Sequence, residues 1–205
     1  MGQLFKNSFS KKFKTQAIIL GSFVSIFWIV ELIDIFIFHG KLDNLGVQPH
    51  TLKGLRGIFF APFLHGDLSH LINNTIPFLV LGSFVMLHRT KDFWIVTLLT
   101  TIIGGLGVWL FGPTNSVHIG ASILIFGYLG FLLLRGYFQK QIISICVSIL
   151  IFCLYGGLII GLLPSQPGIS WQGHLFGFLG GALAARLLKA KKYQFLMFTS
   201  LFLKY

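Results

Sequence analysis

Six long apolar runs, separated by short polar and basic stretches, constrain this chain more than any other feature of its sequence. Each approaches or exceeds the roughly 17–25 residues that an α-helix needs to cross a bilayer. Because hydrocarbon offers no water to satisfy open backbone groups, we expect each run to be helical. The sequence therefore predicts an all-α, polytopic membrane protein with six spans. The runs cover residues 17–38, 70–88, 92–112, 119–137, 141–163 and 171–188.

The composition excludes a soluble domain of this length. Hydrophobic residues make up 55% of the 205 and charged residues only 10%, and the mean hydropathy is +0.83. Five acids and sixteen bases cannot supply a polar shell around a core of this size. Cys146 and Cys153 fall inside one apolar run. We interpret them as small buried residues, not as a disulfide, and no Cys/His spacing indicates a metal site.

The basic residues indicate how the spans are oriented. Although the formal net charge is +11, the bases lie in short clusters between apolar runs, which favours membrane topology over nucleic-acid binding. Only Lys41, Lys53 and Arg56 fall on one side of the predicted bundle, and the other 13 of the 16 bases fall on the opposite side. The positive-inside rule then places both termini in the cytoplasm. An even number of spans gives the same result.

Charge and hydropathy together divide the chain into three parts. We expect a basic cytoplasmic N-terminus over residues 1–16, a membrane domain over 17–190 and a short interfacial tail over 191–205. The one long external loop, about 39–69, carries Gly, Pro and aromatic residues, so it is expected to fold on or into the outer leaflet.

Four polar side chains lie near the outer ends of three predicted spans. His70 and Asn74 begin the second span, Ser122 begins the fourth, and His174 lies three residues into the sixth. On the predicted topology, all four therefore sit at a similar shallow depth below the external surface. Polar groups in hydrocarbon are costly and usually functional, so this agreement indicates a site.

The residue types suit hydrolysis by a serine nucleophile. A serine hydroxyl reacts when a neighbouring base takes its proton, and neutral imidazole does so near physiological pH. His70 and Asn74 are four residues apart, hence on one helix face, and could stabilise an oxyanion together with the Ser122 backbone N–H. Gly177 and Gly181 form a small-xxx-small pair just below His174, which allows helices to approach closely. Alone, a serine in a membrane helix is most often bonded to its own backbone.

Three motifs in this order resemble the rhomboid family of intramembrane serine proteases. They are the second-span pattern from His65 through His70 to Asn74, the run Gly120-Ala121-Ser122 with Phe126-Gly127 and Leu134-Arg135-Gly136 after it, and Gly173-His174-Leu175-Phe176-Gly177 with Gly181. The resemblance covers spans two to six and the first loop, and it implies a six-helix rhomboid-like bundle.

The resemblance also implies roles for individual residues. Ser122 would be the nucleophile and His174 the general base and then acid, in a dyad without a carboxylate. His70 and Asn74 would stabilise the oxyanion, while His65 would support the first loop and Gly120 would lie beside the serine. Ile123 departs from the family, which usually has glycine there, and could crowd the nucleophile or narrow the substrate pocket.

The sequence thus predicts an intramembrane serine endopeptidase that needs no cofactor and no metal. Its partners would be membrane proteins with a transmembrane helix, in a bacterial inner membrane. One alternative is a catalytically weak relative that binds transmembrane helices. A small transporter is a third possibility, but spans three and five offer almost no charged residues for a path. The oligomeric state is left open.

Overall fold

The computed structural model describes residues 2–164 and 168–191, so all but the first residue of the expected tail lies outside the described residues. The described chain is helical, with one isolated bridge between Val47 and His118 as its only strand-like pairing. The long helices are α1 (Gly2–Ile33), α3 (Leu68–Val85), α4 (Thr90–Phe111), α5 (Ser122–Gln139), α6 (Ile142–Tyr155) and α7 (Trp171–Leu187). Shorter elements connect them: η1 (Asp34–Phe38), η2 (Leu42–Leu45), η3 (Lys53–Arg56), α2 (Gly57–Phe60), η4 (Ala61–Phe63), η5 (Gly156–Leu162) and η6 (Leu188–Lys191).

Five stretches of the described chain are long and apolar enough to cross a membrane. They are Ser10–Phe38, Leu68–Val85, Thr90–Phe111, Ser122–Gln139 and Ile142–Leu162. The all-α, multi-pass class predicted from the sequence is therefore confirmed. The sixth predicted run forms α7, which has 17 residues.

Two of the helix boundaries that differ from the predicted runs have local causes. Helix α1 begins at Gly2, far before the first apolar run, because no glycine or proline interrupts residues 3–20. The fourth span begins at Ser122, not 119, because Gly120 has a φ of +115° that helical residues do not adopt.

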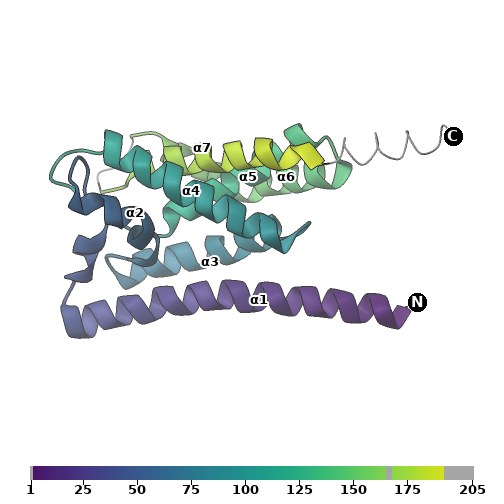
Figure 1. Cartoon of the computed structure of the whole chain (residues 1–205), viewed down its shortest axis with the longest axis horizontal. Helices are drawn as coiled ribbons and strands as arrows, with labels where there is room; N and C mark the ends of the chain where they lie inside the picture. Colours follow the sequence, from purple (N-terminus) through teal and green to yellow (C-terminus); the bar gives the residue numbers. More distant parts are fainter. Residues whose placement is uncertain (1, 165–167, 192–205) are drawn as a thin grey trace.

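Helix α5 lies at the centre of the bundle. It contacts α3, α4, α6 and α7, and its Tyr128, Phe131 and Leu132 are almost fully buried. Figure 1 shows α3 between this group and α1, which runs along the opposite edge, and it shows the start of α1 and the end of α7 at the same end of the bundle.

Helix α6, by contrast, faces outward, and Cys146 and Cys153 on it are exposed and unpaired. The prediction that these cysteines are buried is wrong, because periodicity within an apolar helix does not say which face meets lipid and which meets protein.

Helix α7 packs against α5 through glycines, with backbone in contact with backbone. A Cβ at Gly177 would collide with the Ile123 carbonyl oxygen, and one at Gly181 with the Gly127 carbonyl oxygen. Lipid tails are as apolar as the side chains, so helices in a membrane associate through such close packing and not through a hydrophobic effect. These glycines therefore set how near α7 comes to α5.

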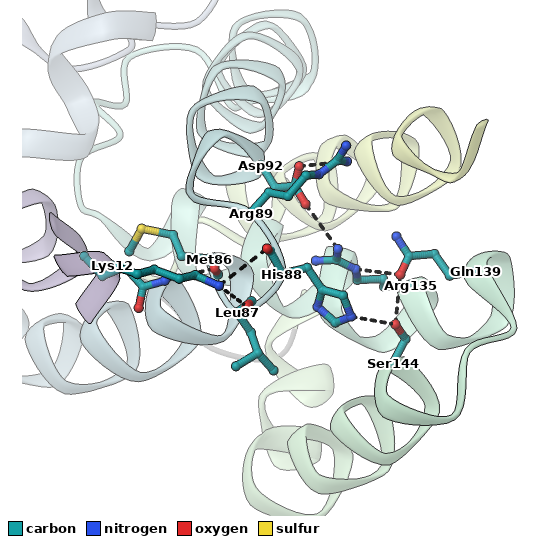
Figure 2. Close-up of polar contacts among 10 residues, drawn as sticks. Lys12, Met86, Leu87, His88, Arg89, Asp92, Arg135, Gln139 and Ser144 are labelled. Atoms are coloured by element: carbon teal, nitrogen blue, oxygen red, sulfur yellow. Dashed lines mark hydrogen bonds and ion pairs between the residues drawn. The ribbon is translucent and has the colours of Figure 1, made fainter. Parts of the chain in front are cut away.

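A partly buried group of polar contacts lies at the end of the bundle where α3 joins α4 (Figure 2). Asp92 accepts from Arg135 Nη2 at 3.1 Å and pairs with Arg89 at 3.0 Å. Arg135 Nε also donates to Gln139, to which Ser144 donates in turn, and Lys12 Nζ donates to the Leu87 carbonyl at 2.7 Å. Three bases that charge counting assigned to one side of the bundle thus lie at one end of it.

Candidate active site

Ser122 is the first residue of α5, and the loop before it is anchored on the first loop. Gly120 N–H donates to the Ala61 carbonyl at 2.9 Å, and Ala121 N–H donates to His65 Nε2 at 3.4 Å. A Cβ at Gly120 would lie 2.6 Å from His70 Nε2, so only glycine fits this turn. The backbone therefore presents Ser122 at a helix N-terminus, where N–H groups lack intrahelical partners.

His174 is held on two sides. Its Nδ1 lies 3.0 Å from the Gly161 carbonyl oxygen, which can only accept a hydrogen bond. Nδ1 therefore carries the proton, and Nε2 of the neutral ring is left as an acceptor. The ring also stacks on Phe126, with centroids 3.9 Å apart and planes 8° from parallel.

Phe126 is a residue whose role the sequence reasoning missed. It follows Ser122 by four positions on α5, hence on the same helix face. A ring stacked on Phe126 is therefore one helical turn from the serine. The sequence shows that Phe126 shares a helix face with Ser122, but an aromatic side chain in an apolar helix gives no sign that it packs on a histidine.

One cavity of about 1270 Å³ contains all four predicted polar residues, Ser122, His174, His70 and Asn74. Phe126 and Gly161 line it as well. No hydrogen bond joins the Ser122 hydroxyl to His174 within the described part of the chain. A hydroxyl rotates freely, and catalytic hydrogen bonds commonly tighten only when substrate binds.

His70 and Asn74 face the turn that precedes the serine. From an ideal Cβ on Gly120, Asn74 Nδ2 is 3.6 Å away and His70 Nε2 is 2.6 Å away. Asn74 is 6% exposed, and its Nδ2 has no hydrogen-bond partner. An amide held in this state beside a serine is suited to a group that arrives with substrate.

His65 lies behind this pair, outside the membrane-spanning helices. Its ring makes an edge contact with His70 at 5.1 Å between centroids, and burial lowers the pKa of His65 to about 3. The ring is therefore neutral over the physiological range, as its acceptor role toward Ala121 N–H requires.

This burial predicts a pH dependence of stability. Between pH 6.5 and 3 the unfolded chain binds a proton at His65 and the folded chain does not, so stability falls on acidification. The loss should reach up to about 1.4 kcal/mol per pH unit in that window. Unfolding in micelles at pH 7, 6 and 5 should show a shallower slope for His65→Asn than for the wild type. The exposed His39, replaced by asparagine, is the control, and an unchanged slope in His65→Asn would contradict the assignment.

Ile123 does not line the cavity, although it follows the serine directly. Its side chain fills the space between Gly104 and Gly177, where a Cβ on Gly104 would lie 2.6 Å from Ile123 Cδ1. The expectation that Ile123 crowds the nucleophile or narrows the pocket is therefore wrong in this structure. The side chain points into the contact between α4, α5 and α7.

Ile123→Ala should consequently cost stability more than chemistry. It leaves a void against two glycines, and because lipid competes for apolar side chains the expected loss is about 1–3 kcal/mol. The labelling rate of the folded fraction by an active-site serine probe should stay within about twofold of wild type. A large rate loss at unchanged stability would show that Ile123 acts on the nucleophile after all.

Comparisons with known proteins identify the family and several relatives of this chain. A family model of the Rhomboid domain matches residues 53–191. The chain is 43% identical over 177 residues to "Uncharacterized protein Rv1337" of Mycobacterium tuberculosis, covering 82% of this chain and 73% of that protein. It is also 43% identical over 179 residues to "Uncharacterized protein ML1171" of Mycobacterium leprae, covering 82% and 70%. "Putative rhomboid protease YdcA" of Bacillus subtilis is 31% identical over 135 residues, covering 63% and 65%.

The fold and these matches define an integral, multi-pass membrane protein of a family of intramembrane proteases. This chain belongs to the rhomboid family. Its mycobacterial relatives fit a bacterial plasma membrane.

Proposed function

We propose that this chain is an intramembrane serine endopeptidase that cleaves membrane proteins in or beside a transmembrane segment. The observation that carries the proposal is one cavity that contains Ser122, His174 with Nε2 free to accept, and the unpaired Asn74 amide. The dyad needs no carboxylate as a third member, because the Gly161 carbonyl fixes the His174 tautomer.

The proposed reaction forms and hydrolyses an acyl-enzyme. Ser122 Oγ attacks the scissile carbonyl carbon as its proton passes to His174 Nε2. Asn74, His70 and the Ser122 N–H stabilise the oxyanion, and its collapse expels the amine, which takes the proton from His174. Water then attacks the ester and gives its proton to His174. Release of the acid returns that proton to Ser122 Oγ. The enzyme needs no cofactor or metal for these steps.

The proposed topology has six spans with both termini in the cytoplasm. Helix α7 supplies the sixth span, and residues 17–190 form the membrane domain. The site then opens toward the outer face, where water can reach the cavity. A substrate helix must unwind locally, because a helical peptide keeps its carbonyls in hydrogen bonds. We therefore expect cleavage at small or helix-breaking residues.

A catalytically weak protein that binds transmembrane helices is the alternative. Such a protein would not need a serine, a histidine and an amide gathered from three helices at one cavity. This arrangement therefore favours the enzyme.

Covalent labelling tests the proposal without knowledge of the substrate. A fluorophosphonate probe should label the wild type in detergent and in liposomes, and Ser122→Ala should not be labelled. Labelling of both proteins, or of neither under conditions in which the wild type is folded, would refute the proposal.

The oxyanion role predicts a specific kinetic loss. Asn74→Ala should lower kcat toward a model transmembrane substrate about 10²–10³-fold, with little change in KM, because the amide bonds the intermediate more strongly than the ground state. Asn73→Ala is the matched control, since Asn73 is exposed at the same cavity. A loss confined to KM would place Asn74 in substrate binding instead.

A further inference from the structure

A chain of side-chain hydrogen bonds connects the loop before Ser122 to the start of the helix that carries His174. Ser116 Oγ donates to the Pro113 carbonyl at 2.6 Å and lies 2.8 Å from His118 Nε2. His118 Nδ1 lies 2.6 Å from Ser170 Oγ. Ser170 is the N-cap of α7, and its Oγ accepts from Gly173 N–H at 3.3 Å.

The direction of each of these hydrogen bonds follows from the number of protons that each side chain can donate. The Ser116 hydroxyl has given its only proton to Pro113, so it must accept from His118 Nε2–H. Burial lowers the pKa of His118, so its ring is neutral and Nδ1 must accept the proton of the Ser170 hydroxyl. Ser170 Oγ then uses a lone pair for Gly173 N–H, and each member has the partner it needs.

Both ends of this connection are fixed in relation to the candidate site. The His118 carbonyl accepts the backbone N–H of Val47 at 3.0 Å, and the His118 N–H donates to the Val47 carbonyl at 2.9 Å. His118 precedes Ser122 by four residues. At the other end, the Ser170 carbonyl accepts the backbone N–H of His174 itself at 3.1 Å. The His118–Ser170 bond thus joins the backbone that presents the serine to the turn that presents the histidine.

We propose that His118 and Ser170 are positioning residues that hold the first turn of α7, and with it His174, at a fixed place relative to Ser122. The inference rests on the proposed function for the role of His174. Farther along the two helices, Gly177 and Gly181 of α7 pack on backbone carbonyls of α5, and Phe178 packs on Gly130. The His118–Ser170 bond adds a side-chain connection at the N-terminal end of α7, where the reaction would occur.

Paired substitutions separate this role from a general role of the loop. In His118→Asn, the amide oxygen takes the place of Nδ1 and keeps the bond to Ser170. In His118→Gln, the amide reaches the position of Nε2 and keeps the bond to Ser116 instead. Ser170→Ala removes the cap hydroxyl, and Ser170→Thr retains it.

Two measurements apply to each variant: the rate of fluorophosphonate labelling at saturating probe, and amide hydrogen exchange in residues 173–175. We expect His118→Gln and Ser170→Ala to label about 10- to 100-fold more slowly, because small displacements of a base have such effects. Exchange should be faster in both. His118→Asn and Ser170→Thr should stay within about twofold of wild type in both measurements.

Several outcomes would overturn the inference. One is His118→Gln behaving like wild type while His118→Asn fails, which would assign the role to the loop. Another is four variants with unchanged exchange, which would show that the bond does not hold α7. If exchange follows the expected pattern but the wild type is not labelled, the proposed function fails and the positioning role fails with it. Expected exchange with labelling equal in all variants refutes the positioning role alone.

Discussion

Ser122→Ala and His174→Ala should each lower the rate of cleavage of a model transmembrane substrate by at least about 10⁴-fold. The serine supplies the bond-forming atom, and the histidine both activates it and protonates the leaving amine. Neither residue can therefore support the reaction without the other. The double variant should therefore be no slower than the single ones, since effects of groups that act as a unit do not add.

The measurement is single-turnover cleavage in liposomes, with substrate and enzyme reconstituted together. Ser69→Ala and His39→Asn are matched controls, because both residues are exposed and neither lines the cavity. Cleavage that persists in Ser122→Ala would assign the activity to another residue or to a contaminant. An additive loss in the double variant would mean that His174 does not act through Ser122.

The sequence was sufficient for the helical class and for the residues that share the cavity. Apolar runs indicate which segments can span, and charge counting predicts their direction. Together they predict that Ser122, His174, His70 and Asn74 lie near one end of the bundle. The residues carry this information themselves, because a polar side chain in an apolar helix stands out.

Ile123 shows what the sequence could not supply. Whether its side chain meets the cavity or the neighbouring helices depends on the rotation of α5 about its axis. That rotation is set by Gly104 and Gly177 on two other helices. The bond between His118 and Ser170 could not be predicted from the sequence either, because the two residues are 52 positions apart and lie in loops.

The sequence indicates only that Arg135 is one of the orienting basic residues and part of a motif. The structure shows that it is buried, with 3% of its side chain exposed, against an Asp92 carboxylate with none exposed (Figure 2). Arg135 follows Ser122 by 13 residues, about 20 Å along α5. The ion pair therefore lies far from the candidate site.

Asp92→Ala should lower the free energy of unfolding by about 3–5 kcal/mol, because the substitution leaves the buried Arg135 guanidinium without its counter-charge. An unpaired ion that is kept out of water loses its hydration and gains no attraction in return. Arg135 Nη1 has no hydrogen-bond partner among the described residues. After loss of Asp92, the donation from Nε to Gln139 is the remaining side-chain hydrogen bond of the guanidinium in the described part of the chain. Arg89→Gln is the control, because the Arg89 side chain is 34% exposed and its bond to Asp92 is worth about 1 kcal/mol or less.

A double-mutant cycle in mixed micelles, with unfolding by sodium dodecyl sulfate, measures this pair. Asp92→Leu combined with Arg135→Leu should be less destabilised than either single variant, because the double variant buries no unpaired charge. Additive losses would show that each residue acts through separate contacts, for instance Arg135 through its donation to Gln139. The folded fraction of Asp92→Ala should still be labelled by fluorophosphonate at close to the wild-type rate. That result would separate the end of the bundle that maintains the fold from the end that holds the nucleophile.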